Sequence, residues 1–161
     1  MRLALYQPDI PQNTGTLLRT AACLGIAVDV IGPTGFDMTD RTLRRAGLDY
    51  LDHVAIQRHE SIGAFQAWRA TVRPPPRLIL LSAHAATSHT DFTYFPTDIL
   101  MLGRESAGVP DTVRRLADAQ IRVAMAPGLR SLNVAIAGAI VLGEALRQTH
   151  GFPASPLPTT E

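Results

Sequence analysis

Residues 120–147, QIRVAMAPGLRSLNVAIAGAIVLGEALR, decide how the rest of the chain can be arranged. The segment begins with a short apolar run at 121–125, typical of a buried strand, and continues into a loop with proline and glycine. Ser131 is expected to cap a helix that opens there and runs past Leu146, because its hydroxyl can accept a bond from a first-turn N–H. Residues 132–143 carry no charge, so we expect this helix to be buried on nearly all sides. The unit is either the floor of a ligand site or an ordinary strand followed by a helix.

Length and composition indicate one ordinary globular domain. The chain has 161 residues and a net charge of +1, and all 15 of its basic residues are arginine. Arginine suits phosphate recognition, although genome composition explains the bias equally well. The single cysteine, Cys23, excludes an internal disulfide and fits a reducing compartment. The N-terminus resembles no signal peptide, so we expect a cytoplasmic protein without a membrane partner. We expect a single domain over 1–150 and a flexible, proline-containing tail over 151–161.

Apolar runs alternate with helical patterns along the whole chain. Strands are expected at residues 2–6, 27–31, 54–57, 78–81, 98–102 and 121–125, and helices at 14–24, 41–46, 61–72, 111–116 and from 131 onward. Asn13 is the expected cap of the first helix and Gly25 its stop. Alternation at this spacing predicts an α/β fold with a mostly parallel sheet flanked by helices.

Three unusual loops should meet where such a sheet binds ligands. Residues 7–13, 103–108 and 127–131 follow expected strands, and ligands of open parallel sheets bind beyond the carboxyl ends of the strands. The dinucleotide fingerprint, the phosphate-binding P-loop and the Gly-x-Ser-x-Gly elbow are absent from the sequence. His84 and His89 share one loop, and solvated histidines are a simpler interpretation than a metal site.

Arg19 has only small residues around it on the face of its expected helix. Its neighbours one turn away are all small: Gly15, Thr16, Ala22 and Cys23. Either this residue is an ordinary surface arginine or its guanidinium serves a site.

Three segments carry a resemblance to a known family. They are NTGTLLR at 13–19, LGRESAG at 102–108 and RSLNV at 130–134, in this order. They resemble the three signature motifs of the SPOUT superfamily of RNA methyltransferases. The stretch RTLRRAGLDY at 41–50 and the one-domain length are similar to the branch that methylates tRNA at the wobble nucleotide. The chain departs from the common pattern at Ala135-Ile136, where Ser-Asn is usual, and at Arg104 and Val109, where Pro and Leu are common.

The resemblance implies a fold, a cofactor and a reaction. The fold would contain a C-terminal trefoil knot that holds S-adenosylmethionine, and the acceptor would be the ribose 2′-hydroxyl of nucleotide 34, a cytidine or modified uridine. No metal is implied. The cofactor pocket would be lined by Leu81, Gly103, Val123, Met125, Ser131 and Leu132. The catalytic set would be Arg19, Asn13, Glu105, Ser131 and Asn133. Because arginine is normally protonated in proteins, we expect Arg19 to position phosphate and stabilise the developing alkoxide; a direct base role is the alternative and would need a strong local perturbation.

The resemblance also implies a homodimer that binds tRNA. The expected RNA contacts are Arg41, Arg44, Arg45, Arg58 and Arg130, although the first three would equally suit a solvated helix face. One alternative keeps the fold but changes the substrate to ribosomal RNA or another tRNA position. A second is a non-catalytic RNA-binding dimer, in which the change to Ala135-Ile136 would indicate that the catalytic site has been lost. A third is a flavodoxin-like nucleotide binder, which the missing phosphate loops oppose.

Overall fold

Short apolar runs bounded by glycine, proline and polar residues form the strands of one sheet. The structure, a computed structural model, describes residues 1–39 and 50–154. Its strands are β1 (Arg2–Tyr6), β2 (Ala27–Ile31), β3 (Ile56–His59), β4 (Leu78–Leu81), β5 (Thr87–Ser88), β6 (Ile99–Leu102) and β7 (Ala119–Arg122). Its helices are α1 (Pro11–Cys23), the 3₁₀ turn η1 (Leu51–His53), α3 (Ile62–Arg69), α4 (Asp111–Arg114) and α5 (Val134–Thr149).

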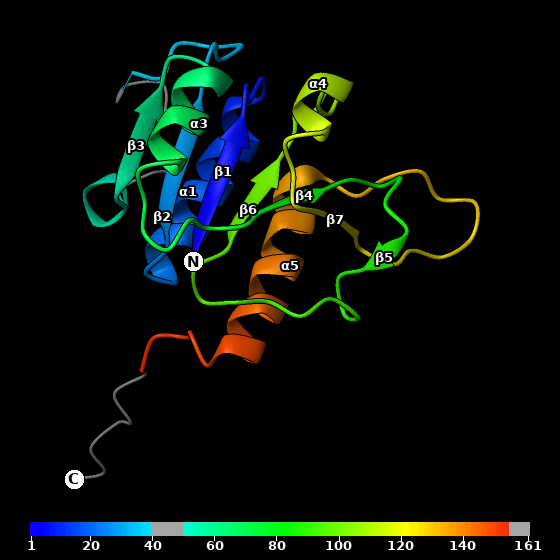
Figure 1. Cartoon of the computed structure of the whole chain (residues 1–161). Coiled ribbons are helices and arrows are strands. Elements are labelled where there is room, and N and C mark those ends of the chain that lie inside the picture. Colours follow the sequence, from blue (N-terminus) through cyan, green and yellow to red (C-terminus); the bar gives the residue numbers. More distant parts are fainter. Residues whose placement is uncertain (40–49, 155–161) are drawn as a thin grey trace, which may run out of the picture.

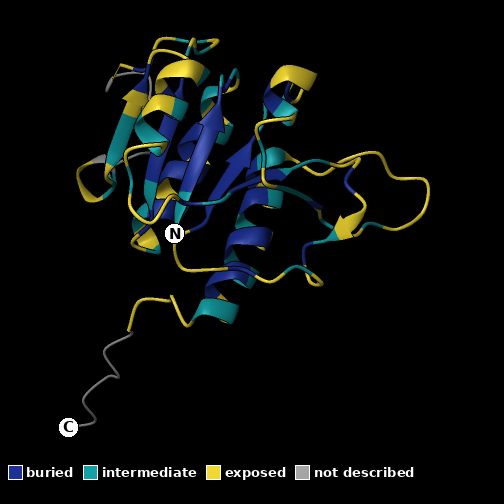
Figure 2. Ribbon diagram, in the orientation of Figure 1, coloured by how far each residue is buried: buried dark blue, intermediate teal, exposed yellow. Residues whose placement is uncertain are grey.

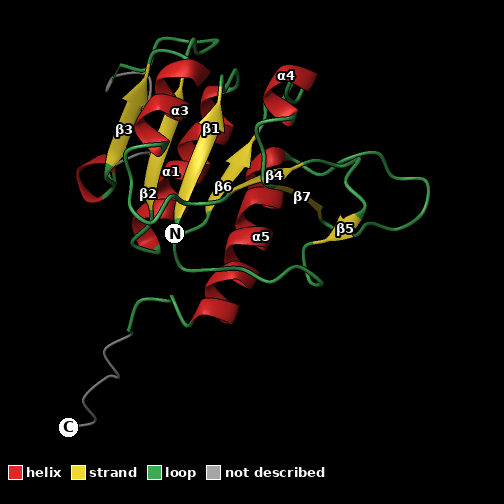
Figure 3. Cartoon of the chain, in the orientation of Figure 1, coloured by secondary structure: helices red, strands yellow, loops and turns green. Residues whose placement is uncertain are grey.

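The sheet has the order β3-β2-β1-β6-β4-β7-β5 (Figure 3). All strand pairs in the described part of the chain are parallel, which confirms the predicted α/β class. The chain first builds outward from β1 to β3, then crosses to the other side of β1, and β6 is inserted between β1 and β4. The strand order therefore reverses beside β1, and this is where open parallel sheets place their ligand sites.

Each face of the sheet has its own hydrophobic core. In β1, Leu3 and Leu5 point to the face covered by α1 and α5, whereas Ala4 and Tyr6 point to the face covered by α3 and α4. This alternation follows from the pleat of a strand, and the central strands are buried on both sides (Figures 1 and 2). Helices α1 and α5 pack closely because Gly138 has no side chain between Leu17 and Leu102. The two helices are therefore held together behind the ends of β1 and β6.

Both expected caps of the site-forming helices were placed wrongly. Helix α1 begins at Pro11 rather than after Asn13, because proline suits the first helical position, where its fixed φ is helical and no N–H is needed. Helix α5 begins at Val134 with Asn133 as its cap, not Ser131. The strand expected at 121–125 is β7, Ala119–Arg122, which starts two residues earlier and ends three residues earlier, so Val123 and Met125 lie in the following loop.

Helix α5 is also less buried than its lack of charge predicted. Its inner face is fully buried at Val141 and Leu142, but Ile136 is 51% exposed and Ile140 is 38% exposed. Leu132, just before the helix, is 41% exposed and extends the same apolar stripe. The prediction of burial on nearly all sides was wrong because apolar character does not show whether a face meets its own core or a second molecule.

Three expectations are not tested by the structure. Two concern residues that it does not describe, and one concerns the path of the chain. The helix expected at 41–46 and most of the tail expected at 151–161 lie outside the described residues. The trefoil knot stays a prediction from the resemblance. No helix in the described ranges is both long and apolar enough to span a bilayer.

Candidate active site

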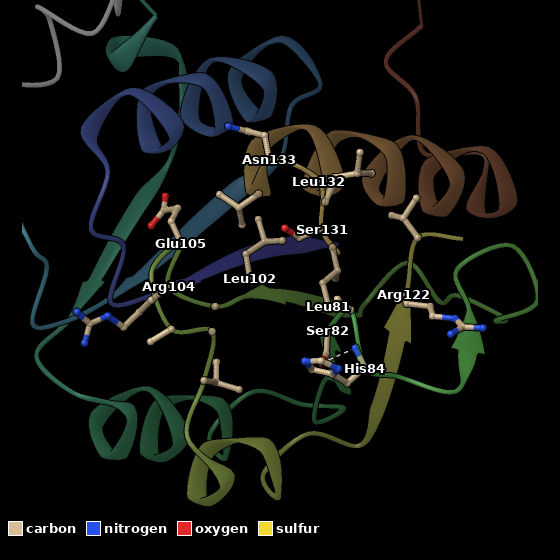
Figure 4. A pocket seen from close by; sticks show the side chains of 18 of the residues that line it. Leu81, Ser82, His84, Leu102, Arg104, Glu105, Arg122, Ser131, Leu132 and Asn133 are labelled. Carbon is tan, nitrogen blue, oxygen red and sulfur yellow. Dashed lines mark hydrogen bonds between the residues drawn. The ribbon is translucent and has the colours of Figure 1, made fainter. Parts of the chain in front are cut away.

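The loops that follow β1, β4, β6 and β7 enclose one pocket of about 510 Å³ (Figure 4). Because the strands are parallel, these four loops lie at the same edge of the sheet. The volume is in the range of pockets that hold drug-sized ligands, ~300–1,000 Å³. The pocket therefore occupies the place that the strand order alone predicts for a ligand.

The middle of the pocket is apolar and its two ends are polar. Leu81, Leu102 and Ile121 come from three adjacent strand ends, and the last two are almost fully buried. Figure 4 shows Glu105 and Asn133 at one end and Ser82, His84 and Arg122 at the other. Such a site can cover a flat apolar group in its centre and orient polar groups at both ends.

The structure brings together nearly all residues that the resemblance assigned to the site. The expected cofactor residues that line the pocket are Leu81, Gly103, Val123, Met125, Ser131 and Leu132. The expected catalytic residues that line it are Asn13, Glu105, Ser131 and Asn133. Their roles stay predictions, but their convergence from three distant motifs is a property of the fold.

Glycine makes the loop after β6 possible. The N–H of Arg104 donates to the carbonyl of Gly108 at 3.0 Å, and the N–H of Gly108 donates to the carbonyl of Arg104 at 2.8 Å. A Cβ at Gly103 would lie 2.8 Å from the carbonyl carbon of Gly108, closer than real Cβ atoms come. Gly108 has φ +64, in the left-handed region that favours glycine. This tight turn presents Glu105 at its tip.

Asn133 connects the last helix to the first. Its Oδ1 accepts from the N–H groups of Ala135 at 2.9 Å and Ile136 at 3.2 Å, which caps α5. Its Nδ2 donates to Oδ1 of Asn13 at 2.9 Å, although the two residues are 120 positions apart. One side chain therefore both starts a helix and orients a polar group in the pocket.

We expect Asn133→Ala to lower the free energy of unfolding by about 0.5–2 kcal/mol, because two N–H groups lose their acceptor. A drop of the melting temperature by a few degrees, ~2–4 °C per kcal/mol, would be seen by calorimetry. Asn133→Asp is the matched variant, since its carboxylate still caps the helix but has no N–H for Asn13. It should keep its stability and lose activity. An alanine variant as stable as the wild type would contradict the capping role.

The carboxyl of Glu105 has an unusual electrostatic environment. Burial raises the pKa of Glu105, a hydrogen bond with the Asp9 side chain raises it further, and the Asn13 side chain acts in the opposite direction. A carboxyl of this kind keeps its proton to a higher pH than an exposed glutamate. Glu105 is thus suited to proton transfer or to donating a hydrogen bond at the pocket mouth.

Arg19 does not reach the pocket of its own chain. It is exposed on α1, and its guanidinium carbon lies 4.6 Å from the ring centroid of Tyr50, a cation–π contact. The guanidinium that the small neighbours leave accessible is therefore packed against the ring of Tyr50. A site that needs both Arg19 and the pocket requires a second copy of the chain or a rearrangement.

The family model of the SpoU rRNA Methylase family matches residues 1–143. The chain belongs to this family. This confirms the predicted membership among RNA methyltransferases. A tRNA (cytidine(34)-2′-O)-methyltransferase from Beijerinckia indica is 58% identical over 146 residues, covering 91% of this chain and 90% of that protein.

Solved structures agree with the assignment to the SpoU family. One, described as giving structural insights into 2′-OH methylation of C/U34 on tRNA, has a TM-score of 0.83 at 39% identity and covers 91% of this chain and 94% of its own. The SpoU methyltransferase AviRb from Streptomyces viridochromogenes, solved with AdoMet, has a TM-score of 0.84 at 29% identity. The match covers 92% of this chain and 60% of AviRb.

Sequence reasoning missed several residues of this SpoU-family pocket. Leu102 and Ile121 form its apolar floor, and Arg114 and Arg122 form its second polar end. The sequence feature that could have identified them is their position, at the ends of expected strands and in the expected helix that follows β6. The two loop histidines differ: His84 is exposed at the pocket rim, as expected, whereas His89 is buried, contrary to the expectation that both are solvated. No group of three or more potential ligands in the described chain is placed to hold a metal ion.

Proposed function

We infer that this protein is an S-adenosylmethionine-dependent methyltransferase that modifies the ribose 2′-hydroxyl of nucleotide 34 in tRNA. The observation that carries the inference is the convergence of Asn13, Glu105, Ser131 and Asn133 on a single pocket. The relative from Beijerinckia indica, which the match covers over 90% of its length, carries the name of this activity. Because its substrate is tRNA, we place its action in the cytoplasm.

The pocket fits the cofactor by size and chemistry. Leu81, Leu102 and Ile121 provide apolar surfaces for an adenine ring, and backbone groups at the strand ends can bond its polar edge. The polar ends can orient the ribose and the amino-acid part. When bound, S-adenosylmethionine supplies a methyl group already activated by a sulfonium, so the protein's task is to position and deprotonate the acceptor.

The polar end of the pocket can hold the acceptor hydroxyl. The Asn133–Asn13 bond fixes one amide beside Glu105, so a ribose 2′-hydroxyl can be held by several directional groups. A free hydroxyl is a weak nucleophile, and loss of its proton must accompany methyl transfer. Glu105 is a carboxyl at the right place to bond that hydroxyl, and Arg19 is the group proposed to stabilise the developing negative charge.

We propose that the working form is a homodimer in which Arg19 of one copy serves the pocket of the other. Leu132, Ile136 and Ile140 form an exposed apolar stripe along the start of α5, next to the pocket. A second copy is the occupant that supplies what a single chain lacks, because Arg19 does not line its own pocket. Burial of this stripe by a second copy would also exclude water from the end of the pocket that holds Glu105 and Asn133.

The activity is tested by incubating purified protein with bulk tRNA and S-adenosylmethionine and mapping ribose methylation by nucleoside mass spectrometry. We expect 2′-O-methylcytidine or a 2′-O-methylated modified uridine at position 34. Methylation at another tRNA position, or only of ribosomal RNA, would support the alternative substrate and refute position 34. Absence of any methylation, with RNA still bound, would favour a non-catalytic RNA-binding dimer.

RNA binding should depend moderately on salt. Arg58 and Arg130 are exposed on the described surface, and Arg58 also donates to the carbonyl of Met38 at 2.8 Å. The other proposed contacts, Arg41, Arg44 and Arg45, lie outside the described residues. Each phosphate contact to a single strand adds about 0.7 to the slope of log affinity against log salt.

Arg130→Ala should therefore weaken tRNA binding and reduce that slope by about 0.7, measured by fluorescence anisotropy at several salt concentrations. Arg73→Ala is the matched control, because Arg73 is exposed but precedes β4, at the opposite edge of the sheet. Equal slopes for the wild type and Arg130→Ala would remove Arg130 from the RNA surface.

A further inference from the structure

Two acidic residues 96 positions apart clasp each other beside the pocket. The N–H of Asp9 donates to Oε2 of Glu105 at 3.0 Å, and the N–H of Glu105 donates to Oδ1 of Asp9 at 3.1 Å. Asp9 lies in the loop after β1 and Glu105 in the loop after β6, and these strands are neighbours in the sheet. Each carboxyl is therefore fixed by the other residue's backbone.

Further contacts hold Asp9 on both sides. Its Oδ2 accepts from the hydroxyl of Ser106 and lies 3.6 Å from Nε of Arg104. On the other side, Gly35 is so close that a Cβ there would lie 2.7 Å from Cβ of Asp9. The side chain of Asp9 is only 14% exposed. Three chain segments thus determine where this carboxylate lies.

Asp9 does not line the pocket, so it acts on the reaction through neighbours that do, and Glu105 is the one whose carboxyl it holds. Two carboxyls in contact resist carrying two negative charges, and one of them retains its proton to a higher pH. The hydrogen bond with Glu105, together with those from Ser106 and the backbone, lowers the pKa of Asp9 to about 2. The pKa of Glu105 is raised, first by burial and then by Asp9. Asp9 is therefore the member of the pair that ionises more readily, and Glu105 keeps its proton to a higher pH than an exposed glutamate.

We propose that Asp9 is a positioning residue for the methyl-transfer site, which holds the Glu105 carboxyl in a fixed orientation beside Asn13. The proposal rests on the proposed function, since Glu105 has a reaction to serve only if the pocket transfers a methyl group. It explains why the loop after β1 is tied to the loop after β6 at their tips as well as along the strands. It also explains why an acidic residue, Asp9, lies beside a site that must bind polyanionic RNA. A negative charge there opposes RNA binding unless it serves another purpose.

The test compares Asp9→Asn with Asp91→Asn. Asparagine at position 9 keeps an acceptor for the N–H of Glu105 but removes the charge, so the fold and cofactor binding should be retained. Asp91 is an exposed loop aspartate whose carboxylate accepts from the hydroxyl of the adjacent Thr90. It does not line the pocket, so its variant removes the same charge elsewhere. We expect kcat to fall by about 10-fold to 100-fold in Asp9→Asn, with the KM for tRNA little changed, because the reacting group is misplaced. Asp91→Asn should behave as the wild type.

The pH profile distinguishes positioning from a merely structural role. The inflection that belongs to Glu105 is the one that Glu105→Gln removes. In Asp9→Asn this inflection should move to lower pH, because the negative charge that opposes ionisation of Glu105 is gone. Carbon-13 NMR of the glutamate carboxyls, assigned with Glu105→Gln, should show the same downward shift in protein without RNA or cofactor.

Two results would overturn the proposal. One is a Glu105 titration that does not move in Asp9→Asn. The other is a parallel loss of thermal stability, cofactor binding and kcat, which would make Asp9 a structural residue only. Failure of the proposed function would look different, because the wild type would then be inactive on every RNA tested. In that case the NMR titration still decides whether Asp9 raises the pKa of Glu105.

Discussion

Arg19→Ala should reduce the rate of tRNA methylation by about 100-fold to 1,000-fold, the loss typical of removing one group that stabilises transition-state charge. The dissociation constant for S-adenosylmethionine should stay nearly unchanged, because Arg19 lies on the exposed side of α1 and does not line the pocket. Isothermal titration calorimetry and single-turnover methylation assays measure the two quantities separately. Arg19→Lys should recover little, since an ammonium cannot reproduce a bidentate guanidinium.

Arg73→Ala, an exposed arginine at the opposite edge of the sheet, is the control and should be fully active. If Arg19→Ala lost cofactor binding in proportion to activity, the residue would be part of the cofactor site instead. Full activity of Arg19→Ala would show that Arg19 takes no part in methyl transfer.

Mixed dimers test whether Arg19 acts on the second copy. A protomer with Arg19→Ala retains a sound pocket, and a protomer with a damaged pocket retains Arg19. If the two act across an interface, one composite site in each mixed dimer is complete. Random mixing in equal amounts should then restore about one quarter of wild-type activity. If Arg19 serves its own pocket, mixing restores nothing.

Gly103→Ala should damage that pocket, with a loss of S-adenosylmethionine affinity of about 10-fold to 100-fold, as expected for overpacking that costs ~1–3 kcal/mol. The added Cβ would lie 2.8 Å from the carbonyl carbon and 2.9 Å from Cα of Gly108. Both are backbone atoms, so no side chain can move aside. The turn from Arg104 to Gly108 must open, and with it the wall of the pocket and the position of Glu105.

Gly63→Ala is the matched control for Gly103→Ala. The nearest atom to a Cβ at Gly63 is Oγ of Ser61, the cap of α3, at 3.6 Å, which is an ordinary van der Waals contact. This variant should bind cofactor normally and be at least as stable, because alanine favours helix. Wild-type affinity in Gly103→Ala would show that the loop after β6 does not form the cofactor site.

Local chemistry accounts for the parts of the fold that the sequence predicted well. Strands β1, β2 and β4 have the predicted bounds, because each is a short, mostly apolar run ended by glycine, proline or polar residues. The helix expected at 61–72 is α3, Ile62–Arg69, which begins directly after Ser61, where the serine hydroxyl accepts from the N–H of Ala64. Where several polar residues compete, as Ser131 and Asn133 do before α5, the choice of cap depended on a partner far away. Asn133 has that partner in Asn13.

From its sequence alone, the protein is determined to be an α/β domain with a parallel sheet and three motifs of an RNA methyltransferase family. Periodicity and strand-ending residues are local properties, and the motifs are read in order along the chain. Only the tertiary structure decided that Asp9 meets Glu105, that Arg19 lies outside its own pocket, and that one face of α5 is exposed. These features depend on which strands become neighbours and on the direction in which a helix presents each side chain, and neither is encoded in any short segment.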